Sequence, residues 1–266
     1  MKNDYSIAIE ASIEAGKVIM SIYEKDFQID FKNDDSPLTE ADTAANSIIM
    51  KYLNKTDIPI ISEENKQTLF ETRKNWTSCW IVDPLDGTKE FIKKNGEFTV
   101  NIALVKNGLP EFGVIYVPAT GVLYFGDVNQ QKAYKIAINH SSYEMVSILK
   151  NATTITPKTD SNAIRVVGSR SHMNQDTLDF VENLKNETKK EIEMVSKGSS
   201  LKFCLVAEGS ADVYPRFAPT MEWDTAAGQA ICMAAGLKVI DNTTNSEMKY
   251  NKENLLNSFF LVSNKI

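Results

Sequence analysis

Apolar residues recur every three to four positions in the first part of the chain. This spacing predicts an amphipathic helix over about residues 5–24, with an apolar face formed by Ala8, Ala11, Ala15, Val18 and Ile22. A short strand is expected at about 28–31, and a polar loop at 32–37. The apolar face of this first helix is therefore expected to pack on a sheet.

A second helix is expected to begin at Thr39. Asp42 follows three residues later, and this spacing resembles a capping box in which aspartate stands where glutamate or glutamine is commoner. The apolar face of this helix consists of Ala41, Ala45, Ile48, Ile49 and Tyr52. Asp42 has two interpretations: a partner of the helix dipole, worth about 0.3–1 kcal/mol, or a functional acid.

Strand patterns dominate the next segment. Residues 58–62 predict a strand that ends at Glu63-Glu64, which is either a solvated exit from the sheet or an acid placed at a strand end. Residues 80–82 predict a second buried strand. A β-meander is expected from 98 to 138, with strands at 98–105, 112–117, 122–125 and 133–138. The first half therefore predicts an α+β lobe over 1–138.

The second half changes pattern after a segment rich in Asn, Ser and Thr at 139–162, which we interpret as the boundary between two lobes. Strands and helices alternate from there to the end, which predicts an α/β lobe over 139–266 with a mostly parallel sheet. The helices are expected at 177–184, at 199–209 with Ser199 as its cap, and at 225–235 before Gly236. The strands are expected at 164–167, 191–195, 212–214, 238–240 and 259–262.

The sequence Asp83-Pro84-Leu85-Asp86-Gly87-Thr88 follows the strand at 80–82. Pro84 fixes one backbone angle and Gly87 permits a positive φ, so the bend can be stiff. The bend then brings four oxygen-bearing groups together within six residues: the two aspartate carboxylates, the Leu85 carbonyl and the Thr88 hydroxyl. Mg²⁺ prefers oxygen ligands of this kind. The alternative is a polar turn whose aspartates bond nearby amides.

Two further segments of the second half carry candidate chemistry. Gly198-Ser199-Ser200 at a helix start is a candidate anion site, and Lys202 and Arg216 are the cations best placed to accompany it. The alternative for both cations is a solvated surface charge. Asp224 lies beside Trp223 at the start of a helix, where it is either a plain N-cap or a further acid of the site.

Composition narrows the choice of function. The chain has 266 residues, 42% of them hydrophobic and 24% charged, which fits an ordered globular protein. No apolar run approaches the roughly 20 residues that span a bilayer, and the first residues lack the apolar block of a signal peptide, so we expect a cytoplasmic protein. Three scattered cysteines and two histidines leave little for a disulfide framework, a zinc site or a His-based triad. A net charge of −6 without a basic stripe argues against nucleic-acid binding.

Five acids stand at ends of predicted strands and helices: Asp42, Glu63, Asp83, Asp86 and Asp224. If the fold brings them together they repel one another and raise each other's pKa, unless cations neutralise them. Two or three Mg²⁺ ions would remove this repulsion and attract phosphate, and paired metals support in-line displacement by water. Because no Cys or His nucleophile is evident, attack of water on phosphorus fits the residues best.

These motifs together resemble a known family. Three ordered segments match the lithium-sensitive, Mg²⁺-dependent inositol monophosphatase-like superfamily: Glu63-Glu64, the segment 83–88, and Trp223-Asp224-Thr225-Ala226-Ala227. Within it, the chain is most similar to the CysQ-type 3′(2′),5′-bisphosphate nucleotidases, on the segments 89–93, 95–101, 198–204, 207–209 and 214–217. The similarity extends over about residues 5–262. It implies the layered α-β-α-β-α sandwich of the inositol monophosphatase and fructose-1,6-bisphosphatase type.

The resemblance also implies roles for individual residues. Glu63, Asp83 and the Leu85 carbonyl would hold one Mg²⁺, and Asp83, Asp86 and Asp224 a second. Thr88, oriented by Asp42, would position and deprotonate the attacking water together with Glu63. The substrate would be contacted by Glu63, Leu85, Asp86, Gly87, Thr88, Ser199, Lys202, Arg216 and Asp224.

The implied reaction removes the 3′-phosphate of 3′-phosphoadenosine 5′-phosphate to give AMP, which recycles a by-product of sulfate activation. An inositol monophosphatase or related sugar phosphatase on the same scaffold is the alternative, and the segments 89–93 and 198–202 argue against it. A metal-dependent nucleotide binder without activity is a third hypothesis, and the pair Thr88 and Asp42 argues against that. The sequence leaves the oligomeric state open.

Overall fold

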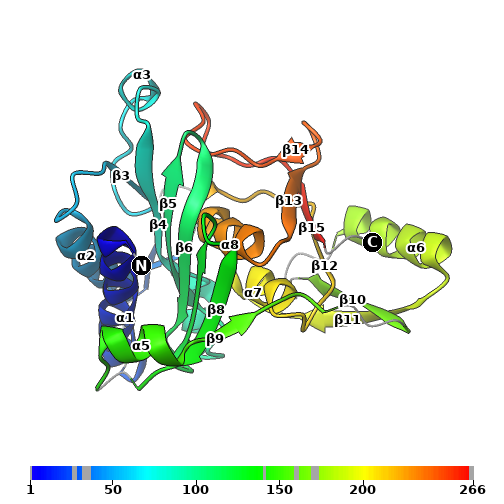
Figure 1. Ribbon diagram of the computed structural model, residues 1–266, viewed down its shortest axis with the longest axis horizontal. Helices are drawn as coiled ribbons and strands as arrows, with labels where there is room; N and C mark the ends of the chain where they lie inside the picture. Colours follow the sequence, from blue (N-terminus) through cyan, green and yellow to red (C-terminus); the bar gives the residue numbers. More distant parts are fainter. Residues whose placement is uncertain are drawn as a thin grey trace.

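The computed structural model describes residues 2–25, 29–31, 37–139, 142–158, 162–168 and 174–263. Two large sheets alternate with three layers of helices (Figure 1). The layers follow the order α-β-α-β-α, which confirms the expected sandwich. A separate two-stranded pair consists of β1 (Ile29–Phe31) and β2 (Pro37–Thr39), which are antiparallel. Most of the predicted loop at 32–37 lies outside the described residues.

The first large sheet has seven strands in the order β3-β4-β5-β6-β7-β8-β9. Their bounds are β3 Ile60–Ser62, β4 Ser78–Asp86, β5 Thr99–Lys106, β6 Leu109–Val117, β7 Val122–Asp127, β8 Lys132–Ala137 and β9 Thr153–Ile155. β3 is parallel to β4, and every later pair is antiparallel. The predicted meander is confirmed as β5 to β8. The strand predicted at 80–82 is longer, because β4 continues through the acids with a shift of register against β5 between Asp83 and Asp86.

Three helices cover the outer face of this sheet: α1 (Asn3–Tyr23), α2 (Glu40–Leu53) and the short α5 (Met145–Asn151). The apolar faces of α1 and α2 pack on the sheet in one hydrophobic core, with Ala8, Ala15, Ala45 and Ile49 fully buried. Thr39 is the N-cap of α2 and exchanges hydrogen bonds with Asp42, which confirms the capping box.

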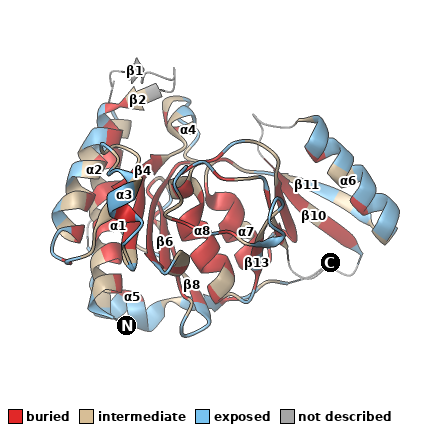
Figure 2. Cartoon of the chain, turned by 90° about the horizontal axis from the view of Figure 1, so that it is seen from above, coloured by how far each residue is buried: buried red, intermediate tan, exposed pale blue. Residues whose placement is uncertain are grey.

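The middle layer holds α7 (Leu201–Ala207) and α8 (Glu222–Ala234), and Figure 2 shows both helices as the most buried of the molecule. Small residues let α8 lie close to the seven-stranded sheet. A Cβ added to Gly113 of β6 would stand 2.5 Å from the Ala227 carbonyl oxygen, and one on Gly126 of β7 would stand 2.8 Å from Ile231 Cα. Glycine is therefore required at both positions by the approach of the helix.

The second large sheet has six strands in the order β11-β10-β12-β15-β13-β14. Their bounds are β10 Ala163–Gly168, β11 Glu191–Ser196, β12 Val213–Arg216, β13 Lys238–Asp241, β14 Ser246–Glu247 and β15 Phe260–Ser263. The prediction of a mostly parallel sheet is wrong: β10 is parallel to β11 and β12, whereas β15 runs antiparallel to both of its neighbours. The turn at 242–245 makes β14 an antiparallel neighbour of β13. The connection over 248–259 contains no helix and brings β15 back antiparallel to β13 and β12. α6 (Gln175–Thr188) covers the outer face.

Three observations complete the fold. All three cysteines, Cys79, Cys204 and Cys232, are buried and free. Among the described residues, no helix is long and apolar enough to cross a membrane. The two-lobe division at residue 139 and the cytoplasmic location stay predictions; β9, from beyond residue 139, pairs with β8.

Candidate active site

The site is built on an irregularity in β4. Asp83 is almost fully buried, and its Oδ1 accepts a hydrogen bond of 3.0 Å from the Leu85 amide. Pro84 lies within the irregular stretch, where a missing amide donor is tolerated in a strand. Gly87 has a φ of +92° and turns the chain into the short helix α4 (Thr88–Ile92). The bend therefore fixes two carboxylates and the Leu85 carbonyl within four residues.

Asp224 joins this bend from the middle layer. α8 begins at Glu222 and not at Thr225, so Asp224 lies in its first turn and is not the N-cap; its Oδ2 accepts the Met221 amide at 2.7 Å. One carboxylate oxygen each of Asp83, Asp86 and Asp224 lies within 4.8 Å of the others. Three acids that are distant in sequence thus form one cluster.

The surroundings of this cluster disfavour negative charge. Burial raises the pKa of Asp83 well above its usual range, and the charges of Glu63, Asp86, Asp224 and Asp42 raise it further. Burial and the neighbouring Asp86 raise the pKa of Asp224 to about 8, although the Met221 amide and Arg216 act in the opposite direction. Oxygen donors that are all acidic and held this close suit a hard divalent cation, which would remove the repulsion.

Glu63 and Asp42 stand at the edge of the same cluster. Glu63 continues from β3, and its amide donates to the Val82 carbonyl at 3.1 Å, which places it beside β4. Asp42 Oδ2 accepts from the Thr39 amide at 2.8 Å and from the Thr39 hydroxyl at 2.7 Å. Its Oδ1 lies 3.3 Å from the Thr88 hydroxyl, which is also 3.4 Å from the Leu85 carbonyl. All five predicted acids therefore meet at one place.

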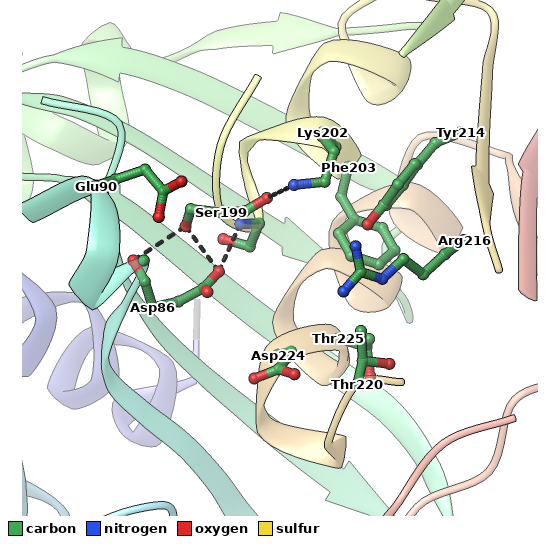
Figure 3. A pocket seen from close by; sticks show the side chains of 12 residues that line it. Asp86, Glu90, Ser199, Lys202, Phe203, Tyr214, Arg216, Thr220, Asp224 and Thr225 are labelled. Carbon is green, nitrogen blue, oxygen red and sulfur yellow. Dashed lines mark hydrogen bonds between the residues drawn. The ribbon is translucent and has the colours of Figure 1, made fainter. Parts of the chain in front are cut away.

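A cavity of about 110 Å³ opens beside the acids, and Figure 3 shows the side chains that line it. Arg216 extends into it from β12, and its buried Nε has no hydrogen-bond partner. Lys202 of α7 is only 5% exposed, and its ammonium donates to the Ser199 carbonyl. Burial lowers the pKa of Lys202 to about 8, even though Asp86 raises it. Both cations thus face the cavity, and neither is a solvated surface charge.

Ser199 has a different role from the one predicted. The N-cap of α7 is Ser200, and its side chain makes no capping bond. Ser199 instead adopts a positive φ of 55°, and its hydroxyl donates to Asp86 Oδ2 at 2.7 Å. The Ser200 amide donates to the same oxygen at 2.5 Å. The 198–200 segment therefore orients Asp86 and links the acids to the cationic side of the cavity.

Sequence reasoning missed several residues of the cavity wall, namely Glu90, Phe203, Tyr214, Thr220 and Thr225. Glu90, Phe203, Tyr214 and Thr225 belong to segments on which the family likeness was based, but no role was predicted for them. Thr220 carried no signal, because it reaches the cavity only through the turn that precedes α8.

Comparison with known proteins decides the family. The model of the inositol monophosphatase family matches residues 1–264. The chain belongs to the inositol monophosphatase family. This family consists of phosphatases that depend on a metal ion, usually Mg²⁺. In the part of the chain that the structure describes, the cluster of Asp83, Asp86 and Asp224 could hold such an ion.

Individual relatives narrow the comparison within the inositol monophosphatase family. A protein of Salmonella typhimurium named 3′(2′),5′-bisphosphate nucleotidase CysQ is 44% identical over 253 residues, covering 94% of this chain and 95% of the relative. The Haemophilus influenzae protein of the same name is 31% identical over 260 residues, covering 94% and 88%.

Solved structures agree with this placement. The crystal structure of CysQ from Bacteroides thetaiotaomicron superposes with a TM-score of 0.87 at 47% identity, covering 98% of this chain and 96% of that one. The suhB protein of Bartonella henselae superposes with a TM-score of 0.76 at 22% identity, covering 99% and 94%, and supports the fold alone.

Proposed function

We propose that this protein is a Mg²⁺-dependent 3′(2′),5′-bisphosphate nucleotidase that hydrolyses the 3′-phosphate of 3′-phosphoadenosine 5′-phosphate to AMP and phosphate. The observation that carries the proposal is the position of an acidic cluster, which contains the buried Asp83, directly beside a cavity with two inward-facing cations. The relatives named CysQ, which align over nearly the whole chain, support the choice of substrate.

The donor set suits two or three Mg²⁺ ions. Glu63, Asp83 and the Leu85 carbonyl would hold one ion, while Asp83, Asp86 and Asp224 would hold another. Mg²⁺ bound there would supply charge neutralisation for the phosphate and lower the pKa of water. The burial of Asp83 supports this assignment, because a buried carboxylate with several acidic neighbours is unfavourable without a cation.

Thr88 and Asp42 would handle the proton of the attacking water, with Glu63 close by. Asp42 Oδ1 accepts the Thr88 hydroxyl proton at 3.3 Å, so the Thr88 oxygen is free to accept a hydrogen bond from water. Two donors from Thr39 hold Asp42 in place and keep its second oxygen occupied. The pair would therefore orient the water and draw its proton toward Asp42.

The remaining contacts would hold the nucleotide. The amides of Gly87 and Thr88 follow the acidic bend and would receive the phosphate that is cleaved. Lys202 and Arg216 would hold the second phosphate, and the buried, unpartnered Nε of Arg216 supports a ligand at this point. Ser199 would complete the wall between the two phosphates. A second anion site also favours the bisphosphate over inositol monophosphate, which has one phosphate.

Phosphate release by the purified protein tests the proposal. We expect Mg²⁺-dependent release from 3′-phosphoadenosine 5′-phosphate, with lower kcat/KM for inositol 1-phosphate and fructose 1,6-bisphosphate. Asp83→Asn should lower kcat more than the roughly 100-fold that follows loss of an outer partner of a metal site. A faster reaction with either sugar phosphate would favour the alternative phosphatase. Tight nucleotide binding without turnover would favour the non-catalytic binder.

A further inference from the structure

Glu222 is a buried carboxylate that the proposed chemistry does not use. It is the first residue of α8, two positions before Asp224, and its side chain is fully buried. Its carboxylate accepts three hydrogen bonds from one loop: from the Asn251 amide at 2.7 Å, the Lys252 amide at 3.0 Å and the Lys252 ammonium at 2.6 Å. We refer to residues 249–257, between β14 and β15, as the 249–257 loop.

The same loop is bound from the other side by Arg73, the last residue of α3 (Phe70–Arg73). The Arg73 guanidinium donates to Asn251 Oδ1 at 3.0 Å and to the Glu253 carbonyl at 2.8 Å, and the Asn251 amide group donates back to the Arg73 carbonyl at 2.7 Å. Arg73 is 3% exposed. Because α3 follows β3 and Glu63 in the chain, the loop connects the segment after Glu63 to the helix that carries Asp224.

The end of the loop fixes the turn that precedes α8. The Asn257 side-chain amide donates to the Met221 carbonyl at 2.8 Å and to the Thr225 hydroxyl at 3.0 Å, and the Asn257 backbone amide donates to the Thr220 carbonyl at 2.8 Å. The Glu222 amide donates to the Leu255 carbonyl at 2.9 Å. The first turn of α8 is therefore held by bonds that all come from one loop.

We propose that Glu222 and the 249–257 loop position Asp224 for metal binding. The inference rests on the proposed function. Asp83, Asp86 and Asp224 repel one another, so a helix end that was free to move would carry Asp224 away from the other two acids. Three hydrogen bonds to a buried carboxylate oppose that movement. Glu222 is thus a positioning residue that acts through Asp224, and it sets the affinity for the divalent ion.

The test measures Mg²⁺ binding by calorimetry in the absence of nucleotide. Glu222→Ala should weaken Mg²⁺ binding roughly 10- to 100-fold, the range typical of outer partners of metal ligands. Glu222→Gln keeps the shape and one acceptor, and should weaken it less. At saturating Mg²⁺ the variants should recover kcat, with the nucleotide KM close to that of the wild type. A kcat that stays low at saturating Mg²⁺ would overturn the inference.

Asp212 offers a matched control. It is 4% exposed and also accepts three hydrogen bonds, from the Arg165 amide at 2.8 Å, Nε at 2.9 Å and Nη2 at 2.8 Å. It precedes β12, whose far end carries Arg216. Asp212→Ala should lower the melting temperature comparably and leave Mg²⁺ affinity unchanged. Equal loss of Mg²⁺ affinity in both variants would reduce the role of Glu222 to general stability and overturn the inference.

Asn257→Ala provides a second route if Glu222→Ala does not fold. It removes the side-chain bonds to Met221 and Thr225 and the bond that Asn257 Oδ1 accepts from the Lys252 ammonium at 3.0 Å, but it retains both members of the Glu222–Lys252 pair. It should weaken Mg²⁺ binding severalfold; unchanged affinity would contradict the inference. The wild type separates this result from the proposed function. If the wild type neither binds Mg²⁺ nor releases phosphate, the proposed function fails; if it does both and the variants bind Mg²⁺ like the wild type, only the positioning role fails.

Discussion

Two regions of this molecule bury charge in opposite ways. In the 249–257 loop, the Glu222 carboxylate meets the Lys252 ammonium at 2.6 Å and two backbone amides. Around the cavity, acids and cations are separated: Asp86 and Asp224 line one side, and Lys202 and Arg216 the other. Asp83 lies beside the two acids. Among the described residues, none of these five takes part in an ion pair within 4.0 Å.

The two regions differ in how far the protein itself compensates the buried charge. Burial raises the pKa of Glu222, and the Lys252 ammonium and the two amides act in the opposite direction. Burial and acidic neighbours both raise the pKa of Asp83 and of Asp224. Under the proposed function, a divalent metal compensates these acids and a phosphate compensates Lys202 and Arg216.

The largest effect is expected at Lys202. Lys202→Met removes a buried cation from the side of the cavity that would bind the second phosphate. Loss of a charged hydrogen bond costs about 1.5–3 kcal/mol, which predicts a nucleotide KM roughly 10- to 100-fold higher. Lys135→Met is the control, because Lys135 pairs with Glu208 at 2.7 Å and lines none of the cavity. An unchanged KM for Lys202→Met would show that this cation serves the protein and not the ligand.

The pH dependence of Mg²⁺ affinity should be of similar size if one proton is displaced. Because burial and acidic neighbours raise the pKa of Asp224 to about 8 and raise that of Asp83 well above its usual range, protons compete with Mg²⁺ for these groups near neutral pH. Mg²⁺ must displace these protons. Affinity should therefore rise with pH between 6 and 8, by up to about tenfold per unit for each proton released. Calorimetry in buffers of different ionisation enthalpy counts these protons; a flat profile would mean that the acids are already ionised.

The smallest expected effect is a change in stability, whose sign should differ between variants of the two regions. Because the pKa of Asp83 is raised in the folded state, the stability this group contributes is present at low pH and is lost as pH rises through its folded pKa. Asp83→Asn should therefore raise the melting temperature in Mg²⁺-free buffer, more at pH 8 than at pH 5. Glu222→Gln should lower the melting temperature, because the unsatisfied partners cost about 1–3 kcal/mol of unfolding free energy. Thermal unfolding of both variants without Mg²⁺ tests the pair, and changes of equal sign would contradict the comparison.

Local sequence signals sufficed for part of this structure. The Thr39 cap, the meander after Phe98 and the acidic bend at Asp83 each depend on neighbours within a few residues, and each is present. The convergence of Asp224 on that bend was expected from family likeness rather than from physics, since no local pattern encodes a contact between residues 83 and 224. The likeness also supplied the five-layer arrangement.

Other features depend on partners far along the chain. Ser199 resembled a cap, but its hydroxyl bonds Asp86, more than a hundred positions earlier. The antiparallel direction of β15 in the second sheet depends on the connection over 248–259, whose course the alternating pattern does not reveal. Glu222 was given no role, and its partners lie about thirty residues later. Residues whose roles are tertiary leave no periodic signal, which explains why these were missed.

The glycines at 113 and 126 have a consequence for engineering. Each leaves only enough room for the backbone of α8 against the seven-stranded sheet. A single methyl group in the middle of that sheet would lift the helix, together with the aspartate on its first turn. Gly113→Ala or Gly126→Ala would therefore lower activity by displacing Asp224, although neither glycine lines the cavity.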